Sequence, residues 1–308
     1  MSKLKDNLLK LINRIFNKKY NNIESLPLAQ SEKILNEIAN SGIIRDFERE
    51  INNGLNITNL DNLYSQKLGS EKYIYNLPLT SKLSESQTIS LAKQFFTSLG
   101  TELSEKANRV LSGKDSKFKF IFEKYGQSLD RNGNPREAEV SNLSEVYCPI
   151  RGDLRDLYSV VHEVTHTFDL SNGDTEARKI FGEIAPQCME RMLDEYLLNL
   201  SDVDIKKYGL DRNILIQDLR NRQVSTFLSR KDNVKSFNID GGNKELDLRY
   251  ILAQIYSSEY IKLDNKTRTN ELLELMENIE CNDIVSCSNS FGIDLKNRLK
   301  MQFIMSDI

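Results

Sequence analysis

Only two histidines occur in this 308-residue chain, and they stand four positions apart in His162-Glu163-Val164-Thr165-His166. On an α-helix, residues four positions apart share a face, so both imidazoles can reach one metal ion. The run LYSVV directly before the motif is apolar enough to bury that helix. The pattern therefore requires a buried helix that carries two metal ligands, and a second element that returns to supply the rest.

A catalytic zinc site uses three protein ligands and leaves one coordination position open. Because no third histidine exists, the remaining ligand must be a carboxylate or a thiolate. The acidic candidates downstream of the motif are Asp169, Asp174, Glu176, Glu183 and Glu190. Two histidines with one carboxylate favour one Zn²⁺ per chain over manganese or cobalt.

Glu183 is the third ligand that we expect. It lies seventeen residues beyond His166, about two turns into the next predicted helix, and a helix–turn–helix of this spacing returns across the histidines. Asp169 is too near, on the same helix, whereas Asp174 and Glu176 look like caps of the next helix. Glu176 remains the alternative ligand.

Two further glutamates have expected roles at this site. Glu163 follows the first histidine and is placed to act as general base toward a zinc-activated water. Glu190 lies seven residues beyond Glu183 on the same helical face. A metal-binding histidine normally donates its other N–H to a carboxylate, and we assign Glu190 to that contact. An ordinary salt bridge is the alternative.

The composition indicates a soluble globular protein. Charged residues make up 28% and apolar residues 39%, and the net charge of −3 offers no basic excess for a nucleic-acid partner. The sequence has no run of eighteen consecutive apolar residues, so we expect no transmembrane helix. The four scattered cysteines are too few for a disulfide scaffold. We expect them to be reduced thiols in a cytoplasmic protein. The many asparagine, lysine and isoleucine residues indicate a bacterial source.

The first nineteen residues, MSKLKDNLLKLINRIFNKK, form a basic amphipathic pattern without the apolar core of a secretory signal. We expect this helix to dock on the rest of the protein. Contact with an anionic membrane surface is the alternative reading of the helix, and export without a cleavable signal peptide is the alternative to a cytoplasmic location.

Periodicity predicts an α+β fold that is predominantly helical, with a small antiparallel sheet of about three strands beside the zinc-binding helices. Residues 118–124 and 138–150 are strand-like, and 84–113 reads as one helix or two. Further helices are expected at 153–169, 175–200, 203–229, 245–263, 267–279 and 291–304. A polar stretch suggests an N-terminal helical region over 1–80 and a catalytic domain over 81–308.

The segment Glu183-Ile-Ala-Pro-Gln-Cys-Met-Glu190, following the histidine motif, resembles the thimet oligopeptidase and oligoendopeptidase F family of zinc peptidases. In that family a metal-binding glutamate opens a short proline-containing segment, and a second glutamate follows seven positions later. The resemblance covers roughly residues 85–265 and is most specific over 153–198. It implies a gluzincin-type metallopeptidase. Family members are much longer than this chain.

The resemblance also implies a role for one tyrosine. The segment from Gly241 to Tyr256 is similar to a late helix of the family, whose tyrosines and histidine stabilise the oxyanion. Tyr250 matches one such tyrosine, while the family histidine is absent. A tyrosine at the edge of the core is the alternative reading of Tyr250.

The leading hypothesis is a zinc-dependent metalloendopeptidase that hydrolyses oligopeptides by a zinc-activated water, with Glu163 as base. One alternative is an effector or toxin-like protease that cleaves one specific partner protein, which the short N-terminal region favours. The other is a catalytically inactive zinc-binding regulatory module, favoured by the missing family histidine and disfavoured by the retained Glu163.

Overall fold

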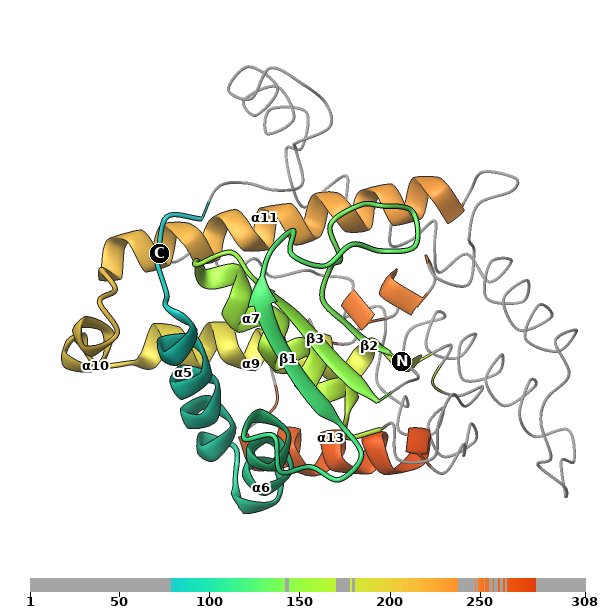
Figure 1. Ribbon diagram of the computed structural model, residues 1–308. Helices are drawn as coiled ribbons and strands as arrows, with labels where there is room; N and C mark the ends of the chain where they lie inside the picture. Colours follow the sequence, from blue (N-terminus) through green and yellow to red (C-terminus); the bar gives the residue numbers. More distant parts are fainter. Residues whose placement is uncertain are drawn as a thin grey trace, which may run out of the picture. The chain divides into compact units, whose positions relative to one another are not determined.

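The structure, a computed structural model, describes residues 79–141, 144–169, 178, 181–237, 247, 249–251, 253–254, 257, 260, 263 and 265–280. Its elements, labelled in Figure 1, are α5 (Glu85–Ser98), α6 (Thr101–Leu111), β1 (Lys119–Lys124), β2 (Glu139–Ser141), β3 (Glu145–Ile150), α7 (Leu154–His166), α9 (Ile184–Asn199), α10 (Asp202–Lys207), α11 (Arg212–Phe237) and α13 (Asn265–Glu280). The predicted class, a predominantly helical α+β fold with one small three-stranded sheet, is confirmed for these residues.

The chain divides into two compact units. One comprises Leu77–Gly173 with Ala185–Gln223, and it holds the sheet together with α5, α6, α7, α9 and α10. The other comprises Met1–Asn76, Asp174–Ile184 and Val224–Ile308, and it holds α13. Helix α11 begins in the first unit and continues into the second. The boundary predicted at residue 80 borders residues outside the described part and stays a prediction.

The segment predicted as one helix or two forms two, α5 and α6. Helix α5 begins with a capping box, in which the Ser84 side chain accepts from the Gln87 backbone N–H and the Gln87 side chain accepts from the Ser84 N–H. It ends before Gly100, whose φ of +117° is unfavourable for residues with a side chain. Both helices bury one apolar face, which includes Phe95 and Phe96.

The sheet has the strand order β1-β3-β2, with β3 in the centre. Strands β2 and β3 pair antiparallel across a short turn, with Val140 opposite Val146. Strands β1 and β3 pair parallel, with Phe120 opposite Val146. The central strand has the most buried residues, including Val146, Tyr147 and Cys148, as its position between two neighbours and against α7 requires.

The all-antiparallel sheet expected from the sequence is wrong in one pairing, because β1 runs parallel to β3. The connection over 125–138 is long enough to cross the carboxyl end of β3. Tyr125 N–H donates to the Ile150 carbonyl at 3.0 Å, and Arg151 forms an ion pair with Glu137. Strand β2 therefore pairs with the far edge of β3 instead of folding back onto β1.

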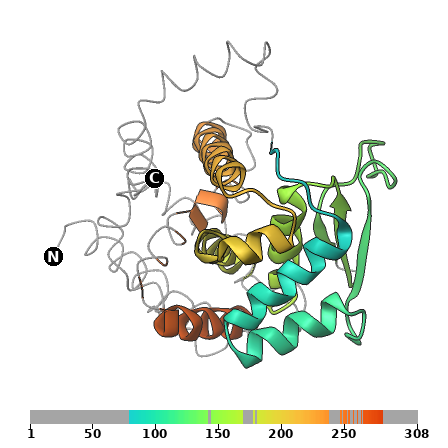
Figure 2. The same ribbon diagram turned by 90° about the vertical axis from the view of Figure 1, so that its left-hand side faces the viewer.

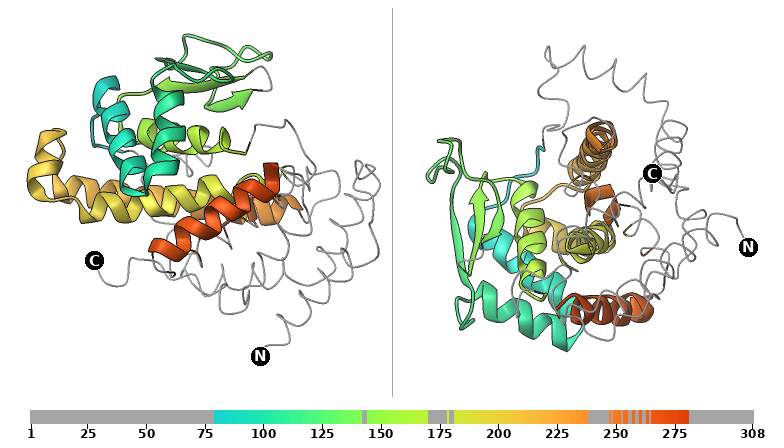
Figure 3. Two further views of the ribbon diagram at one scale, coloured as in Figure 1. Left: turned by 90° about the horizontal axis from the view of Figure 1, so that it is seen from below. Right: turned by 90° about the vertical axis from the view of Figure 1, so that its right-hand side faces the viewer.

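Helix α7 lies between the sheet and α9 (Figures 2 and 3). It packs against β3 on one side and against α5 and α6 at its flank. Asp153 caps its first turn by accepting from the Arg155 N–H at 3.0 Å. Leu154, Leu157, Val160, Val161 and Val164 are completely buried, so the burial that the LYSVV run predicted is observed.

One predicted helix is divided into two in the structure, and other predicted helices lie wholly or partly outside the described residues. The helix expected over 203–229 is broken into α10 and α11 at Gly209, which has a φ of +69°. Only part of 245–263 is described, and residues 1–78 and 291–304 lie outside the described part. Among the described residues, no helix combines the length and the apolar character that a membrane crossing needs.

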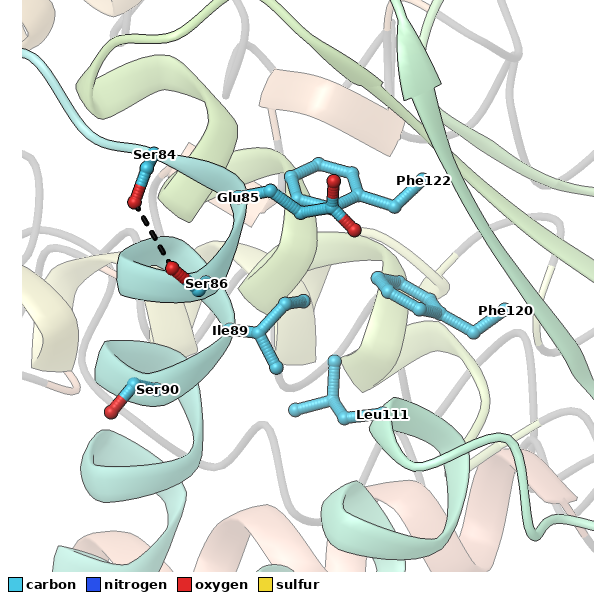
Figure 4. A pocket seen from close by; sticks show the side chains of 8 residues that line it. All are labelled: Ser84, Glu85, Ser86, Ile89, Ser90, Leu111, Phe120 and Phe122. Carbon is cyan, nitrogen blue, oxygen red and sulfur yellow. Dashed lines mark hydrogen bonds between the residues drawn. The ribbon is translucent and has the colours of Figure 1, made fainter.

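A pocket of about 800 Å³ lies between α5, the end of α6 and β1 (Figure 4). Phe120 points from β1 toward Ile89 and Leu111, Phe122 lies beside Glu85 in this view, and the two phenylalanine ring centroids are 5.8 Å apart. Three serines, Ser84, Ser86 and Ser90, also line the pocket. The lining residues include neither histidine, so this pocket is separate from the metal-ligating group described next.

Candidate metal centre

Both histidines belong to α7, which the core holds rigidly. His166 is the last residue of the helix, and Thr167 caps its carboxyl end. His166 is 7% exposed, and the side chain of His162 is 17% exposed. The buried valines of the same helix fix its rotation, so that the two imidazoles share one face as the four-residue spacing predicts.

The two imidazoles converge at their Nε2 atoms, which are 3.1 Å apart. Their ring centroids are 4.8 Å apart, and the ring planes are inclined at 74°. Two nitrogens bound tetrahedrally to one zinc at about 2.0–2.1 Å would be separated by about 3.3 Å. The spacing of the two Nε2 atoms therefore suits joint coordination of one metal ion.

Glu183 supplies the third group. It directly precedes α9, is 5% exposed, and has a carboxylate oxygen in a cluster with the two imidazoles. The three ligand atoms of His162, His166 and Glu183 all lie within 4.8 Å of one another. In chemical terms, two neutral imidazoles and one carboxylate match the donor set of a catalytic zinc site with one open position. This group could hold a metal ion.

The other acidic candidates are placed differently. Asp169 lies after the carboxyl end of α7 and is buried, but it does not belong to the cluster of three. Asp174 and Glu176 lie outside the described residues, so Glu176 stays an untested alternative ligand.

Glu190 lies where it can orient the first histidine. Its Oε1 atom is 2.7 Å from Nδ1 of His162. Burial alone would raise the pKa of Glu190, but the charge of Arg222 and the contact with His162 lower it to about 2. Glu190 is therefore a carboxylate and can only accept, so Nδ1 of His162 carries a proton and Nε2 is the ring nitrogen left for a metal.

Glu163 lies one position after His162 on α7 and is 7% exposed. Burial raises the pKa of the Cys148 thiol, and the negative charges of Glu163 and Asp156 raise it further. A buried carboxylate next to a histidine that could bind a metal is a suitable proton acceptor.

Tyr250 belongs to the other compact unit. The guanidinium carbon of Arg230 lies 4.5 Å from the centroid of its ring, and Tyr250 is half-buried. This cation–π contact holds the ring within its own unit. The role of Tyr250 toward an oxyanion stays a prediction.

The sequence did not predict three residues that lie next to Glu190 or are linked to it by contacts: Tyr158, Asp194 and Arg222. The Tyr158 hydroxyl donates to Asp194, and Arg222 contacts Asp194 and Glu190. The available clue was a repeated spacing, because Tyr158 precedes His162 by four residues and Asp194 follows Glu190 by four. Arg222 gave no local clue, since it lies 32 positions from Glu190.

Comparison with known proteins gave no match: no family model fits the chain, and neither curated proteins nor solved structures resemble it significantly. The resemblance to the oligopeptidase family therefore rests on the sequence motifs alone. The function must be argued from the geometry of His162, His166, Glu183 and their neighbours.

Proposed function

We propose that this protein is a single-zinc metallopeptidase. The observation that carries the proposal is the convergence of the His162 and His166 Nε2 atoms, 3.1 Å apart, with the buried carboxylate of Glu183. The burial of this group suits a bound cation, because a buried carboxylate needs compensation by charge or hydrogen bonds and a metal ion would supply charge. Zinc is the metal that two imidazoles and one carboxylate favour.

His162, His166 and Glu183 would hold the ion, and Glu190 would keep His162 in the correct tautomer and orientation. When bound, zinc supplies Lewis acidity, which polarises a peptide carbonyl and makes water a stronger acid and nucleophile. The protein itself contributes the helix α7, whose buried apolar face holds the two histidines in place.

Glu163 performs the proton transfers of the proposed reaction. As a carboxylate it removes a proton from the attacking water, and as a carboxylic acid it returns that proton to the departing amine. Its 7% exposure limits competition from bulk water. Tyr250 is assigned to the oxyanion only through the family resemblance and forms no necessary part of this proposal.

The substrate class that we propose is an oligopeptide. Peptide hydrolysis is supported by two features that a purely structural zinc site does not need. The histidine pair and one carboxylate leave a coordination position open, and an acid–base glutamate lies next to the first histidine in the sequence. Cleavage of one specific partner protein uses the same chemistry, and the breadth of turnover on unrelated peptides distinguishes the two hypotheses.

The decisive experiment compares wild type with Glu163→Gln, using a library of fluorogenic peptides after zinc loading. Glu163→Gln should keep about one zinc per chain and lose hydrolysis by about 10²–10⁴-fold, because proton transfer is removed while the ligands remain. Glu105→Gln, an exposed change on α6, is the matched control and should hydrolyse like wild type.

Two results would count against the proposal. Equal hydrolysis by wild type and Glu163→Gln would exclude Glu163 as the base. A wild-type protein that binds one zinc per chain and cleaves neither the library nor unfolded proteins would favour the inactive zinc-binding module.

A further inference from the structure

Two polar links of the same kind join α7 to α9. His162 contacts Glu190 at 2.7 Å, and one turn away Tyr158 donates its hydroxyl proton to Asp194. The order is reversed along the two helices, since the earlier residue on α7 meets the later residue on α9. The helices are therefore antiparallel here, and each link repeats the four-residue period of an α-helix.

Arg222 of α11 bridges the two links from the side of α9. One terminal nitrogen donates to Oε2 of Glu190 at 2.9 Å, and the other donates to Asp194 Oδ1 at 3.2 Å. A guanidinium carries its donors in a rigid fork, so both carboxylates are fixed relative to each other. A lysine ammonium can reach either carboxylate but does not reproduce this fork.

The bridge is buried and well packed. Asp194 is completely buried, and the side chain of Arg222 is 13% exposed. The guanidinium carbon lies 3.6 Å from the centroid of the Tyr158 ring, which is a close cation–π contact. Gln223 adds a donor to Asp194 at 3.4 Å, and Arg191 lies 3.9 Å from the same carboxylate.

The positive charge of Arg222 compensates the negative charge of Glu190. Two carboxylates one turn apart on a buried helical face repel each other, and Arg222 compensates both. The two oxygens of Glu190 then have different partners, Nδ1 of His162 on Oε1 and Arg222 on Oε2. Each oxygen of the Glu190 carboxylate therefore has its own partner, which fixes the orientation of the carboxylate. The fixed carboxylate in turn orients the ring of His162.

We propose that Arg222, together with Asp194 and Tyr158, is a positioning residue of the metal centre, which acts on His162 through Glu190. The inference rests on the proposed metal site and does not require peptide hydrolysis. Arg222 touches no metal ligand in any contact described above, so its effect passes through one carboxylate. Residues of this kind typically change metal affinity by about 10–100-fold.

The test measures zinc dissociation constants by chelator competition in wild type, Arg222→Met and Arg222→Lys, beside the thermal midpoint of each metal-free protein. Arg222→Met should weaken zinc binding by about 10–100-fold, and Arg222→Lys should fall between it and wild type. Arg109→Met is the control: it also removes one positive charge, but from an exposed arginine on α6 whose Asp115 partner is 4.0 Å away. It should bind zinc like wild type.

A double-mutant cycle separates positioning from general stability. If Arg222 acts through Glu190, Arg222→Lys should weaken zinc binding in the wild-type background and change it little in Glu190→Gln. Cobalt substitution gives a second readout, since displacement of His162 shifts the visible absorption of the bound ion. The lysine variant keeps the charge, so the cycle remains informative if Arg222→Met fails to fold.

Two outcomes would overturn the inference. One is a zinc affinity within twofold of wild type in both Arg222 variants, whatever their thermal midpoints. The other is an equal loss of affinity in both backgrounds of the cycle, which would mean that Arg222 does not act through Glu190. Failure of the proposed function looks different, because it appears as wild type without hydrolysis, or without zinc before any variant is compared.

Discussion

Nδ1 of His162 on α7 lies 2.7 Å from Oε1 of Glu190, two turns into α9. Because Glu190 is a carboxylate, this contact selects the tautomer in which Nε2 of His162 can bind a metal. The same contact ties together two helices that are separated in the chain by residues 167–183. It thus links the packing of α7 against α9 to the chemistry of the histidine pair.

Removal of the Glu190 charge should weaken metal binding without removing a ligand. We expect Glu190→Gln to raise the zinc dissociation constant by about 10–100-fold, because the amide holds Nδ1–H less strongly and makes the imidazole less basic. Chelator competition measures the change. Glu102→Gln, on the exposed side of α6, is the control, and equal affinities of the two variants would contradict the role given to Glu190.

The third ligand can be tested by metal stoichiometry. Elemental mass spectrometry should find about one zinc per wild-type chain and much less in Glu183→Ala, because two imidazoles alone bind zinc weakly. Glu105→Ala, an exposed change on α6, should retain the metal. Full zinc content in Glu183→Ala would move the third ligand to Glu176, and absence of zinc from wild type after reconstitution would contradict the metal site.

Asp218 should contribute strongly to stability. Its carboxylate is completely buried and accepts from the backbone N–H groups of Thr80 and Ser81 at 2.8 and 2.6 Å. Asp218→Ala leaves these donors without their acceptor and should lower the free energy of unfolding by about 2–3 kcal/mol. Urea denaturation measures the loss. The exposed Asp202→Ala should change stability by about 0.5 kcal/mol or less, and similar values for both variants would contradict the prediction.

The thiol of Cys148 should be inert in the folded protein. It is completely buried, and burial together with the charges of Glu163 and Asp156 raises its pKa well above the usual value. A raised thiol pKa means that the reactive thiolate remains scarce as the pH rises from 7 to 9. Iodoacetamide labelling followed by peptide mapping should show Cys148 modified only after unfolding. Rapid labelling of the native protein that accelerates with pH would contradict this account.

Much of the site could be anticipated because its spacings are local. His162 and His166 share a face through the helical period alone, and the apolar residues before them require that helix to be buried. The same period places Glu183 and Glu190 two turns apart on the following segment. The assumption that this segment returns across α7 was sufficient to predict that Glu190 contacts one of the two histidines. The structure shows that this histidine is His162.

The pairing of β1 could not be anticipated in the same way. The sequence indicates strand-like segments at 118–124 and 138–150, but parallel and antiparallel partners have similar patterns when strands are short. The route of the 125–138 connection past the end of β3 decides the pairing, and Arg151 with Glu137 stabilises it. These contacts depend on groups that meet only after the sheet has formed.

Residue type and helical period were enough to predict the buried histidine helix, the helical class of the fold and the set of candidate carboxylates. The approach of Glu183 and Glu190 to the histidines is a tertiary contact. Tertiary structure alone decided the parallel pairing of β1 with β3 and the position of Arg222 between Glu190 and Asp194. The physical reason is the same for both. A local pattern fixes which face of an element is buried, whereas the register between distant elements is set by the packing and charge compensation of the whole core.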